Sequence, residues 1–346
     1  MLGAGLGGLE QVFLDDQAIL QPWAEAQGGV CVGVARRSAA ILDPAADRAV
    51  TLETMRAAAD WDPLSLLAAR RLVSRAKPDL ILSHGRRAAR LFQRATGPGQ
   101  RLAVCIHKPG FDLERRRTDY ICVSRHLAEH VLAAGAAPER VHVVHNAVAI
   151  PQAPARPFAD PSRPPRIVAA GRLHAKKGFD VLVAALALLR DEGVDFRCDI
   201  AGEGEMRPAL EAQILALRLQ DRVRLVGWSR DVPGFLASGD VFAFPSHQEG
   251  FPLVLLQAMA AGLPVAASAI PGPLEMIDEG FTGRFAADGD PQALAQTLSR
   301  LVADAEDSRR LGEAARLEVA TRYSAEQIRA DLTGVIRTIL DRPLAG

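Results

Sequence analysis

The sequence lacks an apolar run of the ~18 residues that a membrane-spanning helix needs. Its first residues, MLGAGLGGLEQ, have neither the basic start nor the apolar stretch of a signal peptide. Its four cysteines are scattered singly, without CxxC pairs or nearby histidine sets, which argues against a zinc site and against a disulfide framework. These absences favour a reducing, cytoplasmic setting.

The formal net charge is zero, but the charge is unevenly distributed. Residues 1–160 hold 20 Lys and Arg against 16 Asp and Glu, a balance of +4, so the remainder carries −4. Residues 70–117 alone hold 13 basic against 3 acidic residues, a balance of +10. This local excess predicts an anionic partner, either a phosphorylated substrate or a lipid surface; no nucleic-acid partner is expected.

Strand-length apolar segments alternate with helix-like segments along the 346 residues, a length for which two domains are expected. This alternation is typical of parallel sheets covered by crossover helices. In the first half the predicted strands are 30–35, 80–83, 102–106, 120–124 and 141–145, and the predicted helices are 9–27, 63–76 and 86–95. In the second half the predicted strands are 167–170, 196–201, 223–226, 241–244 and 264–267.

The proline-dense segment PQAPARPFADPSRPPR, at 151–166, interrupts the alternation and is interpreted as a linker. The predicted fold is therefore α/β, with two doubly wound Rossmann-like domains facing a cleft. Ligands of such sheets bind at the carboxyl ends of the strands.

A first motif is IVAAGRLHAKKGFDVLVAAL, in which a predicted strand ends in Gly171 and is followed by Arg172 and, at a helix start, Lys177. Glycine allows a tight turn, while the two cations and the free helix amides converge where a phosphate could sit. Alternatively, both cations are solvated loop charges. A second strand running into a Gly-x-Gly turn and a helix, IAGEGEMRPAL with Gly202, favours the phosphate interpretation.

A second motif is HQEGFPLVLLQAMAAGLPVAAS, at 247–268. Pro252 suits the first turn of a helix over 253–261, which the following glycine and proline end. Glu249 then precedes the helix, and Gln257 lies in its second turn with a side chain that leans back toward the amino terminus. This spacing suits one extended ligand, with a sugar near Glu249 and a ribose near Gln257.

Together these motifs resemble the retaining glycosyltransferases of the GT-B fold, specifically family 4, glycosyl transferases group 1. The family pattern Glu-x7-Glu is present as EGFPLVLLQAMAAGLPV, with Gln257 in place of the second Glu. The GRL-x3-KG segment is similar to the family's donor-diphosphate site. The resemblance implies donor contacts from Gly7, Gly8, Gly171, Arg172, Lys177, Gly202, Glu249, Gly250, Phe251, Pro252, Leu253 and Gln257.

The sequence departs from the family pattern in two places, at Gln257 and at its start. A neutral hydrogen bond from Gln257 contributes roughly 0.5–1.5 kcal/mol, against about 1.5–3 for a charged partner, so weaker or altered nucleotide binding is expected. The Gly7-Gly8 turn resembles the family's glycine loop, but family members have a β-strand before it and this chain begins at Leu2-Gly3. Either the start lies upstream or the first sheet lacks that strand.

His107, at the end of the apolar stretch LAVCIH, matches a family histidine that faces the donor sugar. A histidine at a strand end can equally be a packing or capping residue. The resemblance implies catalytic roles for Glu249, His107, Arg172 and Lys177.

For the whole chain, the resemblance implies an acceptor domain over 1–155 that lacks its first strand, a donor domain over 156–322, and a helix over 323–346 that packs back on the first domain. The implied activity is metal-independent, retaining hexosyl transfer from a nucleotide-diphosphate sugar, a UDP-sugar above all, without a cofactor. The implied acceptor is anionic or lipid-linked, in envelope polysaccharide or lipopolysaccharide synthesis, with peripheral contact at the inner face of the plasma membrane. A nucleotide-sugar epimerase of the same fold and a non-catalytic nucleotide-sugar binding protein remain alternatives.

Two Asp-x-Asp stretches, Asp60-Trp-Asp62 and Asp288-Gly-Asp290, are similar to the metal motif of the other glycosyltransferase fold. Each precedes a proline and a helical stretch, so helix capping explains them better. No metal site is predicted.

Arginines recur every fourth residue from Arg86 through Arg90 to Arg94, and an ERRR run follows at 114–117. They are either a solvated helix face or a surface that docks on anionic lipid or holds a phosphorylated acceptor.

Overall fold

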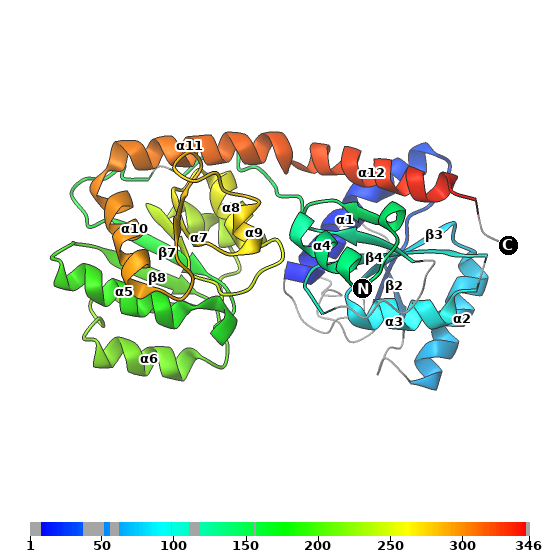
Figure 1. Cartoon of the computed structure of the whole chain (residues 1–346), viewed down its shortest axis with the longest axis horizontal. Coiled ribbons are helices and arrows are strands. Elements are labelled where there is room, and N and C mark those ends of the chain that lie inside the picture. Colours follow the sequence, from blue (N-terminus) through cyan, green and yellow to red (C-terminus); the bar gives the residue numbers. More distant parts are fainter. Residues whose placement is uncertain are drawn as a thin grey trace. The chain divides into compact units, whose positions relative to one another are not determined.

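The computed structural model describes residues 8–36, 52–55, 62–97, 99–110, 118–155 and 157–343 (Figure 1). The chain divides into two compact units. The first runs to Ala147 and includes the C-terminal segment from Ala325, and the second consists of Val148–Ser324. Each unit contains parallel β-sheet and helices, so the predicted α/β class is confirmed.

The first unit is built on a four-stranded parallel sheet in the order β3-β4-β5-β6. Its strands are β3 (Leu80–His84), β4 (Arg101–Ile106), β5 (Asp119–Cys122) and β6 (Val141–Val143). Two further strands, β1 (Gly33–Arg36) and β2 (Leu52–Met55), pair with each other in parallel. The sequence does not predict β2, because Leu52–Met55 is neither a continuous apolar run nor a strict alternation of apolar and polar residues.

The helices of the first unit are α1 (Gly8–Ala26), α2 (Pro63–Ala76), α3 (Arg86–Ala95), α4 (Arg125–Ala133), a short 3-10 helix (Pro138–Arg140) and α12 (Ala325–Asp341). Helix α2 begins after Asp62, whose carboxylate accepts a hydrogen bond from the Leu64 N–H. The capping interpretation of Asp62 is thus confirmed, whereas Asp60 lies outside the described residues.

Helix α12 is part of the core of the first unit. The buried cluster that it shares with α1 and the sheet is Ile19, Leu20, Ala103, Cys105, Ile121, Val144, Ala147, Ile328, Leu332, Ile336 and Ile339. Just beyond the helix, Arg342 donates a hydrogen bond of 2.6 Å to the buried carboxylate of Asp119, which also accepts one from Arg140. Burial raises the pKa of Asp119, but hydrogen bonds from His142 and Arg342 outweigh it and leave the pKa below its usual value. These contacts attach the C-terminal segment to the first sheet.

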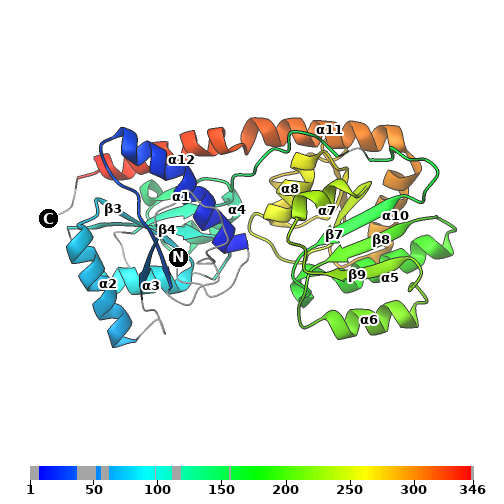
Figure 2. The ribbon, with the colours of Figure 1, turned by 180° about the vertical axis from the view of Figure 1, so that it is seen from behind.

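The second unit is built on a six-stranded parallel sheet in the order β12-β11-β10-β7-β8-β9, with β9 at the edge beside β8 (Figure 2). Its strands are β7 (Arg166–Ala170), β8 (Arg197–Ala201), β9 (Val223–Gly227), β10 (Val241–Phe244), β11 (Val265–Ser268) and β12 (Arg284–Ala286). The chain proceeds from β7 through β8 to β9, then returns to the other side of β7 with β10. This is the doubly wound order, and its switch point lies between β7 and β10.

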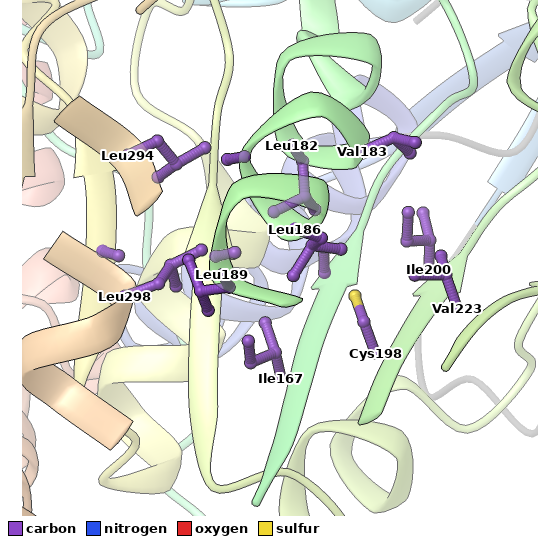
Figure 3. Close-up of a cluster of buried hydrophobic side chains, with 14 of the residues drawn as sticks. Ile167, Leu182, Val183, Leu186, Leu189, Cys198, Ile200, Val223, Leu294 and Leu298 are labelled. Atoms are coloured by element: carbon purple, nitrogen blue, oxygen red, sulfur yellow. The ribbon is translucent and has the colours of Figure 1, made fainter. Parts of the chain in front are cut away.

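Helices cover both faces of a doubly wound sheet because each crossover returns the chain to the start of the next parallel strand. Here they are a 3-10 helix (Ala175–Lys177), α5 (Phe179–Asp191), α6 (Arg207–Ala216), α7 (Val232–Ala237), α8 (Leu253–Ala261), α9 (Pro271–Leu274), α10 (Pro291–Ala303) and α11 (Ala305–Arg322). Leucines of α5, including Leu182 and Leu186, pack between Ile167 of β7 and Leu298 of α10 (Figure 3). Asp290 caps α10 through the amides of Gln292 and Ala293, which confirms the capping interpretation of that stretch.

The described residues of the proline-dense segment belong to the second unit. The Ala155 N–H donates to the carbonyl of Ala261, and the Phe158 N–H donates to the buried carboxylate of Asp240. Arg163 forms an ion pair of 2.6 Å with the same carboxylate. This part of the chain is therefore packed against the unit that follows it.

Within the described ranges, no helix combines the length and the apolar character needed to cross a membrane.

Candidate functional site

Two loops at the carboxyl edge of the second sheet are clamped together. The Gly171 N–H, just after β7, donates to the carbonyl of Ala201 at 2.9 Å. The Leu173 N–H donates to the carbonyl of Glu203 at 2.9 Å, so the loop after β7 is bonded to the loop after β8 along its length. These backbone bonds hold Arg172, which lies between the two donors, in one place.

Gly202 lies within this contact, with a φ of +141°. A Cβ added there would lie 1.8 Å from the carbonyl oxygen of Gly171, and backbone atoms on both sides prevent a small adjustment. We expect Gly202→Ala to destabilise the second unit by about 1–3 kcal/mol or more. We also expect it to weaken ligand binding at Arg172. Thermal unfolding with nucleotide titration measures both.

Gly193→Ala is the matched control for this prediction. Gly193 also has a positive φ, +79°, but an added Cβ would meet no atom within 4 Å. If both variants lose the same stability, the positive φ alone explains the loss, and the proposed role of the close contact between the loops is refuted.

The loops after β7 and β10 also interlock, across the switch point. A Cβ added at Gly178, where φ is +61°, would lie 2.0 Å from the carbonyl oxygen of Pro245. The His247 N–H donates to the carbonyl of Lys176 at 2.9 Å, and the Lys176 ammonium donates to the side-chain oxygen of Gln248 at 2.7 Å. The segment before Glu249 is thus held against the segment that carries Lys177.

Lys177 and Glu249 form an ion pair across this junction, with Nζ and Oε1 2.5 Å apart. Both side chains are largely covered, with 26% of Lys177 and 14% of Glu249 exposed. The sequence interpretation directs Lys177 toward a phosphate, whereas the structure gives it a carboxylate partner. An ammonium carries three N–H donors, so this pair leaves other donors of Lys177 for a ligand.

Arg172 is an exposed cation of the site. Its guanidinium makes no ion pair or hydrogen bond with any residue in the described part of the chain. A Cβ built on Gly171, the residue before Arg172, would lie 3.8 Å from two side-chain carbons of Lys177. The side chain of Lys177 therefore passes beside the turn that carries Arg172. Since the Lys177 charge is balanced by Glu249 and the partner of Lys176 is the neutral Gln248, Arg172 and Lys176 carry the uncompensated positive charge.

Helix α8 has the predicted bounds, beginning after Pro252 and ending at a left-handed Gly262. The ring of Phe251 is buried against Tyr323, with centroids 5.3 Å apart, so only its backbone is available to a ligand. Gly250 and Pro252 are also buried, and Leu253 is half-buried. Gln257, half-buried in the second turn, has no side-chain hydrogen bond to another described residue.

His107 belongs to the first unit, just beyond β4, and Gly8 is the exposed first residue of α1. Burial lowers the pKa of His107 to about 4, so the imidazole is neutral at pH 7. Gly7 lies outside the described residues. The structure therefore brings together the predicted site residues of the second unit: Gly171, Arg172, Lys177, Gly202, Glu249, Gly250, Phe251, Pro252, Leu253 and Gln257.

Sequence reasoning missed a polar cluster beside His107. The parallel register pairs His84, the last residue of β3, with Cys105 of β4, and His107 follows two residues later. The ligand atoms of these three side chains lie within 4.8 Å of one another. His84 and Cys105 are 21 positions apart, so the spacing of residues in the sequence does not show this contact.

A second missed contact joins His247 to Asp288, with Nδ1 and Oδ1 2.6 Å apart. Asp288 is the first residue of the Asp288-Gly-Asp290 stretch, and His247 lies in the loop after β10. No sequence signal relates these two positions, because they follow different strands.

The chain forms two α/β units, and the second has positively charged side chains suited to binding an anion at the switch point of its sheet. The family model for glycosyl transferases group 1 matches residues 155–318, which is nearly all of the second unit. The second unit therefore matches the glycosyl transferases group 1 family, and the resemblance to that group is confirmed. The assignment to retaining family 4 stays a prediction.

Two curated relatives illustrate this similarity. AmsK of Erwinia amylovora, an amylovoran biosynthesis glycosyltransferase, is 31% identical over 230 residues, covering 61% of this chain and 56% of AmsK. LpsE of Rhizobium meliloti, a lipopolysaccharide core biosynthesis glycosyltransferase, is 28% identical over 268 residues, 76% of each protein. The chain thus spans little more than half the length of AmsK.

Solved structures resemble nearly the whole chain. A glycosyltransferase from Rickettsia africae has a TM-score of 0.83 at 18% identity, covering 99% of both chains. HepE from Anabaena, crystallised with UDP and glucose, has a TM-score of 0.82 at 20% identity, covering 97% of this chain and 98% of HepE. At these identities the likeness concerns the fold, and it confirms the predicted GT-B architecture.

Proposed function

We propose that this chain is a retaining glycosyltransferase that moves a hexose from a UDP-sugar to an acceptor in envelope polysaccharide or lipopolysaccharide synthesis. The observation that carries the proposal is the unpaired guanidinium of Arg172 beside the Lys177–Glu249 pair at the switch point. Switch points of doubly wound sheets are where nucleotides bind. The names of AmsK and LpsE support the reaction class, and the UDP of the HepE structure supports the nucleotide.

In this proposal Arg172 and Lys177 bind the donor diphosphate. As the bond from the sugar to the diphosphate breaks, negative charge grows on the leaving oxygen. Positive groups that are already in place stabilise this charge without reorganising, which is often the largest contribution to catalysis. The clamped loops around Gly171 and Gly202 provide that rigidity.

Glu249 and Gln257 are proposed to hold the two ends of the donor. The carboxylate of Glu249 is fixed by Lys177 through one oxygen, so its other oxygen can accept hydrogen bonds from sugar hydroxyls. Gln257, one helix turn into α8, is proposed to bond a ribose hydroxyl. The backbone of Gly250 to Leu253 lies between them and contacts the donor through its amides.

Retention requires the acceptor hydroxyl to arrive on the face from which the diphosphate leaves. We propose that the leaving phosphate oxygen takes the proton of this hydroxyl as the new C–O bond forms, so neither a metal nor a protein base is needed. His107, neutral at pH 7, is proposed to position the donor sugar through a hydrogen bond. Gly7 and Gly8 are proposed to approach the donor through their backbone.

Calorimetric titration of the chain with UDP, GDP and ADP tests the proposal. UDP is expected to bind, and Arg172→Ala combined with Lys177→Ala is expected to abolish binding. Arg300→Ala is the control, because Arg300 is exposed in the last turn of α10, away from the carboxyl edge of the sheet. If no nucleotide binds to the folded chain, the proposal fails.

Incubation with UDP-hexoses and a lipid-linked saccharide acceptor then separates the alternatives. Transfer to the acceptor supports the proposal. Release or conversion of the sugar without an acceptor would identify an epimerase-type enzyme, and nucleotide binding without turnover would identify a binding protein.

The proposed setting is the cytoplasmic face of the membrane, with the basic first unit toward anionic lipid. We expect the chain to sediment with phosphatidylglycerol vesicles but not with phosphatidylcholine vesicles. Replacing the exposed Arg86 and Arg94 of α3 by Ala should weaken this partition roughly 30-fold, at about 1 kcal/mol per arginine. Partition that is equal for both lipids would contradict the prediction.

A further inference from the structure

His84, Cys105 and His107 form a compact group in the first unit, which we call the His-Cys-His cluster; His84 and Cys105 are buried and His107 is half-buried. His107 follows the end of β4 directly, and its ligand nitrogen lies within 4.8 Å of the Cys105 thiol. The register places His84 directly beside Cys105 on the neighbouring strand. His84 and Cys105 are only 2% and 3% exposed.

The cluster contains buried nitrogens without partners. Nδ1 of His84 and Nε2 of His107 make no hydrogen bond to any residue in the described ranges. Buried polar atoms in folded proteins nearly always have a partner, so the unsatisfied Nε2 of His107 indicates a missing ligand. In His84 the nitrogen that faces Cys105 is Nε2, not the unsatisfied Nδ1. The contact of the Cys105 thiol with Nε2 of His84, at 3.8 Å, satisfies neither Nδ1 of His84 nor Nε2 of His107.

The geometry of the cluster suits a tetrahedral metal ion. Zinc bonds of about 2.05 Å to nitrogen and about 2.3 Å to sulfur place these two atoms about 3.6 Å apart. The observed separation between Nε2 of His84 and Sγ of Cys105 is 3.8 Å. All three ligand atoms lie within 4.8 Å of one another, so the third ligand needs to approach by no more than about 1.5 Å.

We propose that His84, Cys105 and His107 bind one zinc-class divalent ion. Two imidazoles and a thiolate favour zinc over magnesium or calcium, which prefer oxygen ligands. Three protein ligands leave a fourth position for water or for Asp16, whose Oδ2 lies 3.5 Å from Nε2 of His84. This site belongs to the first unit, whereas the anion site belongs to the second.

Metal binding has a consequence for the proposed sugar transfer. An ion that holds the His107 imidazole prevents it from contacting a donor, so zinc is expected to lower turnover and a chelator to restore it. This consequence rests on the proposed function. Metal binding itself is measured without turnover, so the two proposals can fail independently.

The test titrates the full chain, stripped with a chelator under reducing conditions, with Zn²⁺ against a chromogenic chelator and with Co²⁺ by absorption. One equivalent is expected to bind, with a sulfur-to-cobalt charge-transfer band. Cys105→Ser and His84→Ala should each lower zinc affinity by at least about tenfold, the loss typical even of groups that only support metal ligands. Circular dichroism checks that each variant remains folded.

Cys122→Ser and Cys31→Ser are the matched controls. Cys122 is equally buried on the neighbouring strand β5, and Cys31 is a half-buried thiol of the same unit, yet neither belongs to the cluster. Both should bind zinc and cobalt as the unmodified chain does. The proposal is overturned if the unmodified chain shows no cobalt–sulfur band, or if the Cys31 or Cys122 variant loses zinc as Cys105→Ser does.

Discussion

Arg172→Ala is expected to lower kcat/KM for sugar transfer by about 100- to 1000-fold while the melting temperature stays unchanged. A single preorganised charge at a developing anion commonly contributes this much. The side chain is exposed and has no partner among the described residues, so its removal breaks no contact of the folded protein. Surface changes of this kind usually alter stability by less than about 0.5 kcal/mol.

Initial rates of UDP release, measured beside thermal unfolding, check this prediction. Arg172→Lys keeps the charge but loses the planar fork that binds two phosphate oxygens, so it should restore only part of the rate. Arg300→Ala should match the unmodified chain. Activity that falls only together with the melting temperature would show a structural role and contradict the proposed one.

Lys177 is a less selective probe of the same site. Lys177→Ala removes a phosphate ligand and also leaves the largely covered carboxylate of Glu249 without its partner. A loss of activity in that variant would therefore have two causes: weaker binding of the donor, and a Glu249 carboxylate that is no longer held in place and repels the donor diphosphate. The contrast between the two cations follows from one ion pair, which makes Arg172 the better test of charge stabilisation.

Much of the second unit could be predicted from the sequence, because its signals are local. Its strands are short apolar runs followed by turns, and helix α8 occupies the predicted residues 253–261. Gly202 stands where only a residue without a Cβ fits. In each case neighbouring residues determine the structure, so the pattern is visible in one stretch of sequence.

The contacts that were missed join distant residues. Lys177 and Glu249 are 72 positions apart, and His247 and Asp288 are 41 positions apart. Each pair forms because parallel strands bring their carboxyl ends to one edge of the sheet. The sequence predicted that these loops meet there, but side-chain pairing depends on strand order and register, which have no local pattern.

The His-Cys-His cluster shows the same limit in the first unit. Had β3 been displaced by one residue relative to β4, His84 would face away from Cys105, because side chains alternate along a strand. The observed register was needed to recognise the group. Counting cysteines and their spacing therefore led to the opposite expectation.

Asp240→Ala is expected to destabilise the second unit by about 3–5 kcal/mol, because it removes hydrogen bonds from two backbone N–H groups to a charged carboxylate, each contributing about 1.5–3 kcal/mol. Asp240 is 1% exposed, immediately before β10. One carboxylate oxygen accepts from the Phe158 N–H at 2.6 Å, and the other accepts from the Arg166 N–H at 2.7 Å. Arg163 donates to both oxygens. This one side chain thus attaches the proline-dense segment to the starts of β7 and β10.

Hydrogen exchange of the amides in β7 and β10 measures this loss within the second unit. Asp221→Ala, a change at an exposed aspartate of the same unit, should leave the exchange unchanged. Arg163 is 35% exposed and can turn to water, so the loss should come mainly from the backbone amides of Phe158 and Arg166. Asp240→Asn, which keeps one acceptor oxygen, should then fall between Ala and the unmodified chain. If Ala and Asn exchange equally fast, the charge pair with Arg163 is the dominant contact instead. UDP affinity of the folded Asp240→Ala variant should be unchanged, because Asp240 lies at the amino edge of the sheet and Arg172 at the carboxyl edge.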